Sequence, residues 1–206
     1  MLDLTLYFVT PPISEDLDSW EHLIKEAVWG GVTVVQIRDK CCSTKKMSEA
    51  AQRIHPFLKE RGVPLLVNDR ADIAYVLALD GVHLGQSDLS VGKARLLLGP
   101  QAIIGISLEN REQIKTTEGA DYIAASPVLP SKTKITLSVW GLEGLKTLRK
   151  EISSPLIAIG GIHETNLLNI LEIGVDGVAV VSAIANSPNP RVAAARLNAI
   201  CRGIKK

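Results

Sequence analysis

TVVQIRDK, residues 33–40, is the stretch that decides the fold. Val34 and Val35 are β-branched and apolar, as is typical of a strand covered on both faces. Gln36, Arg38 and Lys40 follow, and they share one side of the strand if it stays extended. Two cations and an amide at the carboxyl end of a buried strand suit a polyanion. The alternative is a strand that ends in a solvated charged loop.

The rest of the chain repeats this unit of a short apolar strand followed by a helix. Glycines end several of the helices, as at Gly31, Gly81, Gly119 and Gly174. Alternating strands and helices imply parallel strands with right-handed crossovers. Eight such units predict an α/β fold, a single-domain (β/α)8 TIM barrel over residues 1–206, with an open doubly wound sheet as the alternative. The predicted strands span residues 6–10, 33–40, 64–68, 82–85, 102–108, 122–128, 156–160 and 178–182, and the helices 14–28, 43–61, 71–79, 91–98, 110–117, 142–151, 163–173 and 191–202.

Composition narrows the class of protein. The 206 residues carry a net charge of +1, which argues against nucleic acid as a partner. The most apolar runs, residues 155–162 and 174–185, are too short to cross a membrane, and residues 1–10 do not resemble a signal peptide. Three cysteines without a C-x-x-C argue against a disulfide framework. We therefore expect a cytoplasmic protein.

Polar residues gather where the predicted strands end, which is where a barrel of this kind holds its active site. The opposite ends carry glycine, alanine, valine and proline, with only scattered polar residues. This asymmetry is the strongest functional signal in the residues themselves. The polar ends comprise Gln36, Arg38 and Lys40 after the second strand, Asn68 and Asp69 after the third, Gln86 to Asp88 after the fourth, Ser107 after the fifth, Ser131 to Lys134 after the sixth, Gly160 and Gly161 after the seventh, and Ser182 after the eighth.

Asp69 and Asp88 follow adjacent strands and could share one hard cation. Carboxylates suit Mg²⁺, which takes its remaining ligands from water and substrate phosphates. Beside Arg38 and Lys40, the pair predicts a magnesium–pyrophosphate site. Taken singly, each aspartate is also a common helix N-cap.

Two further segments suit anions. Gly160-Gly161 and the region of Ser182 follow the strands after which this fold often holds a phosphate, although simple turn chemistry gives the same pattern. The run Ser131 to Lys134 offers two hydroxyls and two cations, which fits a lid or a solvated loop.

Covalent catalysis has no evident candidate in this sequence. There is no nucleophile elbow, no G-x-G-x-x-G and no Walker loop. The four histidines lack metal-ligand spacing, and His83, inside a strand, is best interpreted as a structural histidine. Trp20, Trp29 and Trp140 leave a homo-oligomer open, while a core position is the simpler interpretation of each.

With these residues assembled, the chain resembles the thiamine phosphate synthase family over nearly its whole length. The pairing of QIRDK with ND and HLGQSD is specific, whereas IAIGGI recurs in many phosphate-binding barrels. The matching stretches are LYFVT at 6–10, VVQIRDK at 34–40, LLVNDRADIA at 65–74, GVHLGQSDL at 81–89, GIS at 105–107, GADYIAASPV at 119–128, PSKTK at 130–134, GLEGL at 141–145, IAIGGI at 157–162 and GVAVVSAI at 177–184.

The resemblance implies an enzyme, a transferase that joins 4-amino-2-methyl-5-hydroxymethylpyrimidine diphosphate to a thiazole phosphate and releases thiamine phosphate and pyrophosphate. It also implies Mg²⁺ at Asp69 and Asp88, and catalytic roles for Arg38, Lys40, Ser107 and Lys134. By the same resemblance, the pyrimidine diphosphate contacts Gln36, Ile37, Arg38, Asp39, Lys40, Asn68, Ser107 and Lys134, and the thiazole phosphate contacts Ser131, Lys132, Thr133, Gly161, Val181 and Ser182.

Three alternatives stay open. A related thiazole tautomerase tends to lose the metal aspartates and uses a histidine near the end of strand six, where this chain has Ser126. A non-catalytic ligand-binding or regulatory homologue would keep the barrel, and departures from the family pattern at residues 108–110 and 135–140 leave room for it. Another phosphate-handling barrel isomerase or lyase would need an acid–base pair, and none stands out.

Overall fold

The computed structural model describes residues 2–130 and 139–204, which form a closed barrel of parallel strands in sequence order, β1 to β8. The predicted (β/α)8 barrel is confirmed, and the open sheet is wrong. The strands are β1 (Leu6–Val9), β2 (Val34–Ile37), β3 (Leu65–Asn68), β4 (Gly81–Leu84), β5 (Ile103–Leu108), β6 (Tyr122–Ala125), β7 (Leu156–Ile159) and β8 (Gly177–Val180). The helices are α1 (Leu17–Trp29), α2 (Thr44–Glu60), α3 (Ala71–Val76), α4 (Val91–Leu98), the 3₁₀ helix η1 (Arg111–Thr116), α5 (Gly141–Glu151), α6 (Leu167–Leu171), α7 (Ser182–Ala185) and α8 (Pro190–Ile204).

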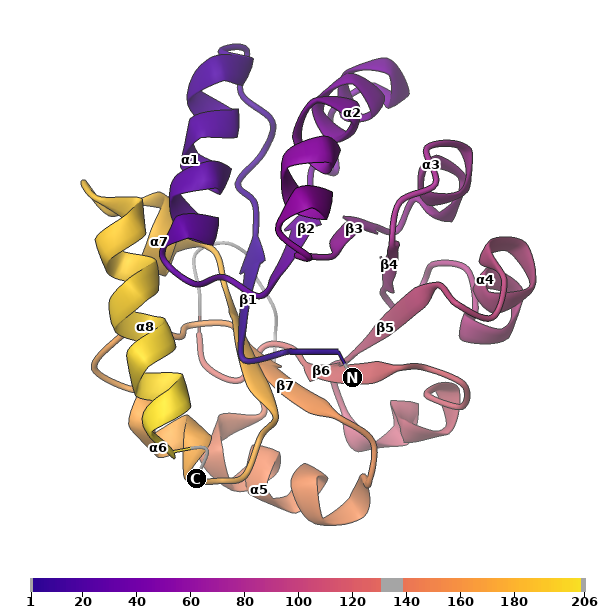
Figure 1. Cartoon of the computed structure of the whole chain (residues 1–206). Coiled ribbons are helices and arrows are strands. Elements are labelled where there is room, and N and C mark those ends of the chain that lie inside the picture. Colours follow the sequence, from indigo (N-terminus) through magenta and orange to yellow (C-terminus); the bar gives the residue numbers. More distant parts are fainter. Residues whose placement is uncertain (1, 131–138, 205–206) are drawn as a thin grey trace.

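The helices surround the ring of strands, and α8 packs beside α1 where the ring closes (Figure 1). On that side β1 pairs with β8 in parallel, with Tyr7 opposite Ala179. Its other neighbour is β2, where Phe8 lies opposite Val35. Closure therefore leaves no free sheet edge among the strands.

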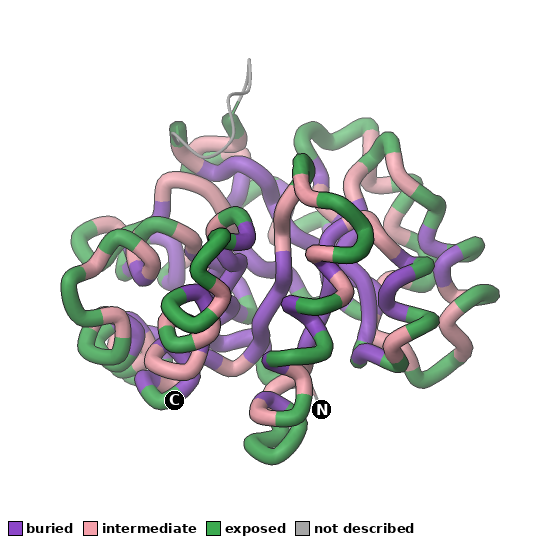
Figure 2. Tube along the Cα trace, turned by 90° about the horizontal axis from the view of Figure 1, so that it is seen from above, coloured by how far each residue is buried: buried purple, intermediate pink, exposed green. Residues whose placement is uncertain are grey.

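Side-chain alternation divides the buried residues into two cores. One face of β2 turns Val35 and Ile37 toward the helices, and the other turns Val34 into the barrel. The interior core also contains Tyr7, Leu66, Tyr122, Ile157 and Ala179. Figure 2 shows the strands buried within a largely exposed outer layer. Because the interior is filled, it forms a floor beneath the carboxyl ends of the strands.

Several helices differ from the predicted ones for local reasons. The helix expected at residues 110–117 is 3₁₀, and none of its residues is buried, so no apolar face favours a longer α-helix. The helix predicted from residue 14 begins at Leu17, because Asp16 caps it: its carboxylate accepts bonds from the N–H groups of Asp18 and Ser19. Ser43 caps α2, and its side chain accepts the N–H of Lys46. Helix α7 was not predicted.

The α6 helix starts later than the predicted residue 163. The Asn166 side chain accepts a bond from His163 N at 2.9 Å and donates to Gly161 O at 2.8 Å. These bonds hold residues 163–166 in a loop, and the helix begins only after it.

The three tryptophans do not all lie in the core. Trp20 is buried, and its ring nitrogen donates to Pro11 O. Trp29 is 44% exposed, with the guanidinium of Arg191 5.0 Å from its ring centroid. The core position expected for Trp29 is therefore wrong, and self-association stays a prediction. No helix in residues 2–130 and 139–204 has the length and apolar composition needed to cross a membrane.

Aspartates fasten the amino ends of three strands. Oδ2 of Asp80, Asp121 and Asp176 accepts the N–H of Leu65 at 2.8 Å, of Ile104 at 2.7 Å and of Leu156 at 2.8 Å, respectively. Asp121 and Asp176 also form ion pairs with Arg95 and Arg149. The scattered polar residues at this end of the barrel are thus structural.

We expect Asp121→Ala to lower the free energy of unfolding by about 1–2 kcal/mol, because Ile104 N–H loses its acceptor and Arg95 loses its ion-pair partner. A fall in Tm of about 2–8 °C would report this in differential scanning calorimetry. Asp72→Ala is the matched control, since it removes a surface ion pair with Arg70 and should change stability by less than about 0.5 kcal/mol. Equal losses in both variants would contradict the fastening role.

Candidate active site

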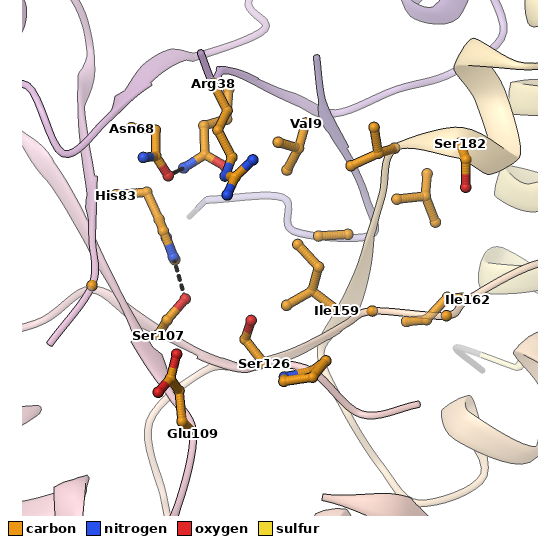
Figure 3. Close-up of a pocket in the computed structure, with 18 of the residues that line it drawn as sticks. Val9, Arg38, Asn68, His83, Ser107, Glu109, Ser126, Ile159, Ile162 and Ser182 are labelled. Carbon is orange, nitrogen blue, oxygen red and sulfur yellow. Dashed lines mark hydrogen bonds between the residues drawn. The ribbon is translucent and has the colours of Figure 1, made fainter. Parts of the chain in front are cut away.

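A cavity of about 850 Å³ opens at the carboxyl ends of the strands, above the interior core. Its size is that of a small-molecule site. Each strand, or the residue just after it, contributes to the lining, as Figure 3 shows for one set of these residues. The contributors are Val9 from β1, Gln36 from β2, Asn68 from β3, His83 from β4, Ser107 from β5, Ser126 after β6, Ile159 from β7 and Ala179 from β8.

Most of the predicted site residues line this single cavity. They come from six strand ends that are far apart in the sequence. The ten residues that it brings together are Gln36, Arg38, Lys40, Asn68, Asp69, Asp88, Ser107, Gly161, Val181 and Ser182.

Two predicted contacts have side chains engaged elsewhere. Ile37 is fully buried in the core between the strands and the helices, because alternation turns it away from Gln36. Oδ1 of Asp39 accepts the N–H groups of Cys41 and Cys42, and its Oδ2 accepts that of Ile13. These bonds help to hold the pKa of Asp39 below its usual value, although burial opposes them. Ser131, Lys132, Thr133 and Lys134 lie outside the described residues.

The end of β2 directs its polar side chains into the cavity. Gln36 is 3% exposed, and its amide nitrogen lies 3.4 Å from Asn68 Oδ1. Arg38 points toward the centre in Figure 3, and its backbone N–H donates to Thr10 Oγ1. Among the described residues, no carboxylate pairs with the Arg38 guanidinium within 4.0 Å. Its planar donors are therefore available for an anionic ligand.

Asp69 and Asp88 form a pair of carboxylates at the cavity rim. Burial, followed by the adjacent Asp88, raises the pKa of Asp69, although Lys40 Nζ lies 3.3 Å from Asp69 Oδ2. The described residues contain no cluster of three or more acidic, histidine or cysteine side chains suited to a metal. Two carboxylates fit Mg²⁺ nevertheless, because this ion is usually held by one or two carboxylates together with substrate phosphates.

Neither aspartate serves as a helix N-cap, so that alternative is wrong. Arg70 occupies the cap position of α3, and Ser90 that of α4. Asp69 has φ of 63°, in the left-handed region that aspartate and asparagine tolerate best. Asp88 Oδ2 accepts Gly85 N–H at 2.8 Å. This hydrogen bond within the loop after β4 orients the Asp88 carboxylate.

Glycines make room on the opposite side of the cavity. Gly161 has φ of 68°, and a Cβ there would lie 2.7 Å from both Leu129 Cβ and Pro130 O. Only glycine fits this backbone without strain. Gly161, Val181 and Ser182 all line the cavity, and they follow the adjacent strands β7 and β8.

Comparison with known proteins decides the family. The family model for thiamine monophosphate synthase matches residues 6–184. The thiamine-phosphate synthase of Vibrio campbellii is 42% identical over 200 residues, 96% of this chain and 98% of that protein, and that of Syntrophomonas wolfei is 44% identical over 201 residues, 96% of each chain. The thiamine phosphate pyrophosphorylase structure from Pyrococcus furiosus superposes with a TM-score of 0.88 at 33% identity, covering 100% of this chain and 98% of that one.

The chain belongs to the thiamine monophosphate synthase family. The resemblance seen in the sequence is therefore confirmed, and the match spans all eight strands. Within this family member, the aspartates that a tautomerase-like protein tends to lose are both present at the rim of the cavity.

Sequence reasoning missed several residues that line the cavity of this thiamine monophosphate synthase family member. His83 is hydrogen-bonded through both ring nitrogens, as expected of a structural histidine, but it also faces the cavity. Glu109 lies beside Ser107 in Figure 3. Extending the alternation that placed Gln36 and Arg38 to every strand would have found His83 and Ile159, since both occupy inward positions near strand ends.

The raised pKa of Asp69 predicts a gain in stability on removing its charge. A raised carboxyl pKa means that ionised Asp69 disfavours the folded state, and this penalty is present above the folded-state pKa and absent below the unfolded one. We expect Asp69→Asn to raise the Tm of the metal-free protein by about 1–2 °C near neutral pH, because asparagine keeps the left-handed backbone and removes the repulsion. The gain should shrink toward about pH 4. Scanning calorimetry in EDTA at both pH values measures it, and a lower Tm at neutral pH would contradict it.

Proposed function

We propose that the chain is a thiamine-phosphate synthase that joins 4-amino-2-methyl-5-hydroxymethylpyrimidine diphosphate to a thiazole phosphate in the cytoplasm. The observation that carries this proposal is the convergence of Arg38, Lys40 and the Asp69–Asp88 pair on one cavity in a member of this family. The three free cysteines of the chain agree with a reducing compartment.

The pyrimidine diphosphate would lie over β2 and β3. The amides of Gln36 and Asn68 would orient the pyrimidine, since both are buried and present donors and acceptors from fixed positions. Arg38 and Lys40 would bind the diphosphate, together with Ser107, and Lys134 would join them from its segment outside the described residues. The negative charge that develops on departing pyrophosphate would thus meet donors that are already in place.

Asp69 and Asp88 would hold Mg²⁺, which supplies Lewis-acid stabilisation of a phosphate leaving group when bound. Lys40, now paired with Asp69, would be free to contact the diphosphate once a cation balances the two carboxylates. The aspartates themselves would transfer no proton in this scheme.

Bond breaking would precede bond making. The C–O bond breaks, pyrophosphate leaves with the electron pair, and the aminopyrimidine stabilises the positive charge on the exocyclic carbon. The thiazole nitrogen then donates its lone pair to that carbon. The chain contributes orientation by holding the thiazole phosphate against Gly161, Val181 and Ser182, with Ser131, Lys132 and Thr133 as further contacts predicted by the resemblance. No protein nucleophile is required.

The decisive experiment incubates the purified protein with both substrates and Mg²⁺ and follows thiamine phosphate and pyrophosphate. We expect both products in equal amounts, and none after EDTA, with activity restored by added Mg²⁺. Absence of product under all conditions, with retained binding of the thiazole phosphate, would favour a regulatory homologue. Metal-independent product would overturn the assignment of Asp69 and Asp88.

Gly161→Ala tests the thiazole phosphate side of the cavity. The added Cβ would meet Leu129 and Pro130 and strain the backbone at φ of 68°. We expect KM for the thiazole phosphate to rise about 10-fold or more, the equivalent of about 1.4 kcal/mol, with KM for the diphosphate little changed. Gly174→Ala is the matched control, since its φ is also positive but nothing lies within 4 Å of an added Cβ. Equal effects on both KM values would contradict the assignment.

A further inference from the structure

Four side chains form a hydrogen-bond chain through the barrel interior to the cavity. The Tyr7 hydroxyl lies 2.9 Å from the Tyr122 hydroxyl, which lies 2.8 Å from His83 Nδ1. His83 Nε2 lies 2.8 Å from Ser107 Oγ, the bond drawn in Figure 3. The chain thus runs from the interior core to a residue that lines the cavity.

The barrel is built to place Tyr122 in this chain. Its ring stacks near that of His83, with centroids 5.6 Å apart and an interplanar angle of 29°. A Cβ on Gly105 would lie 2.1 Å from Tyr122 Cζ and 2.4 Å from its hydroxyl oxygen. Glycine at this position therefore leaves room for the phenol in the barrel interior. Tyr7 and Tyr122 are at most 1% exposed, so water does not replace their mutual bond.

The direction of the chain follows from counting protons. Burial raises the pKa of both phenols, so each keeps one proton to donate. Within the described part of the chain, the Tyr122 hydroxyl is the one partner of the Tyr7 hydroxyl. If Tyr7 donates to Tyr122, then Tyr122 donates to His83 Nδ1, and every proton has an acceptor. The reverse direction would leave the Tyr7 proton buried without an acceptor, which is costly.

We propose that His83 is a positioning residue whose neutral Nε2–H tautomer, fixed by the donor hydroxyl of Tyr122, donates to Ser107 and turns the Ser107 proton into the cavity. The Ser107 hydroxyl then acts as a donor to an oxygen of the bound diphosphate. In the opposite tautomer, Nδ1–H, the Ser107 hydroxyl would donate its hydrogen bond to His83 Nε2 and not to the ligand. The donation from Ser107 to the diphosphate rests on the proposed function of the cavity, whereas the tautomer of His83 does not.

Nitrogen NMR of the ¹⁵N-histidine-labelled protein tests the tautomer without turnover. His83→Gln assigns the signal among the four histidines. We expect a protonated Nε2 and an unprotonated Nδ1 at neutral pH. Tyr122→Phe should give a mixture of tautomers, because Nδ1 loses its donor, whereas Tyr7→Phe should leave the tautomer unchanged. A dominant Nδ1–H form in the wild type, or an unchanged tautomer in Tyr122→Phe, would overturn the proposal.

Kinetics then test the consequence for Ser107. His83→Gln presents an amide N–H in place of Nε2–H and should keep kcat within about 3-fold, whereas His83→Asn should lower kcat about 10-fold with little change in KM. Adding Ser107→Ala to His83→Asn should cost less than Ser107→Ala costs in the wild type, because His83 acts on the diphosphate only through the Ser107 hydroxyl. Multiplicative losses in the double variant, or no rescue by glutamine in a folded protein, would overturn the positioning role. If no variant or wild type turns over, the proposed function fails while the NMR result still decides the tautomer.

Discussion

Arg38→Gln should reduce kcat/KM about 10²–10³-fold while the barrel stays folded. The guanidinium points into the cavity, and no carboxylate pairs with it in the part of the chain that the structure describes, so its removal costs the fold little. Without Arg38, the negative charge that develops on pyrophosphate in the transition state loses one preorganised donor. Removing one such donor typically lowers the rate about 10²–10³-fold. Steady-state rates of thiamine phosphate formation measure it.

Arg70→Gln is the matched control for this substitution. Arg70 lies two residues after Asn68 and is paired with Asp72. We expect its variant to retain kcat/KM within about 3-fold, because surface ion pairs contribute little. If both variants lost activity alike, the effect at Arg38 would reflect altered charge near the barrel rather than contact with the diphosphate.

Asp88→Asn should reduce kcat about 10²–10³-fold at saturating substrates and raise the Mg²⁺ concentration needed for half-maximal rate. Asparagine keeps an oxygen that can accept Gly85 N–H, so the loop geometry is retained while one ligand charge is lost. Charge stabilisation by a bound cation is worth several kcal/mol, and each 1.36 kcal/mol is a factor of ten. A titration of rate against Mg²⁺ measures both quantities.

The control for Asp88 is Asp72→Asn, which removes one carboxylate charge from a neighbouring surface helix. We expect an unchanged Mg²⁺ titration. Should Asp88→Asn also leave the titration unchanged, with activity still abolished by EDTA, the metal would have to bind elsewhere.

The barrel and much of the cavity could be predicted because both follow from short-range patterns. Apolar strands followed by amphipathic helices determine the fold class, and alternation along β2 placed Gln36 and Arg38 on one face. The same pattern predicted the neighbouring carboxylates, since β3 and β4 are adjacent in a barrel that keeps sequence order.

What escaped prediction depends on distances between segments. Nothing in the spacing of Tyr7, His83 and Tyr122 reveals that three separate strands bring their side chains into hydrogen-bonding range. The hydrogen bond from Ile13 N–H to Asp39 likewise could not be predicted, because it depends on where the loop after β1 lies. Local competition also decides helix ends, as Asn166 does for α6.

The aspartates that fasten the amino ends of the strands have a consequence for how this barrel could acquire new substrates. Asp80, Asp121 and Asp176 bind strand backbone on the side away from the cavity, so the loops at the other end can be exchanged without disturbing these anchors. The stability of the barrel and the specificity of its cavity therefore depend on residues at opposite ends of the strands. A library that diversifies only the loops beyond the strand termini should keep a large share of folded members and make this chain a suitable starting scaffold for directed evolution.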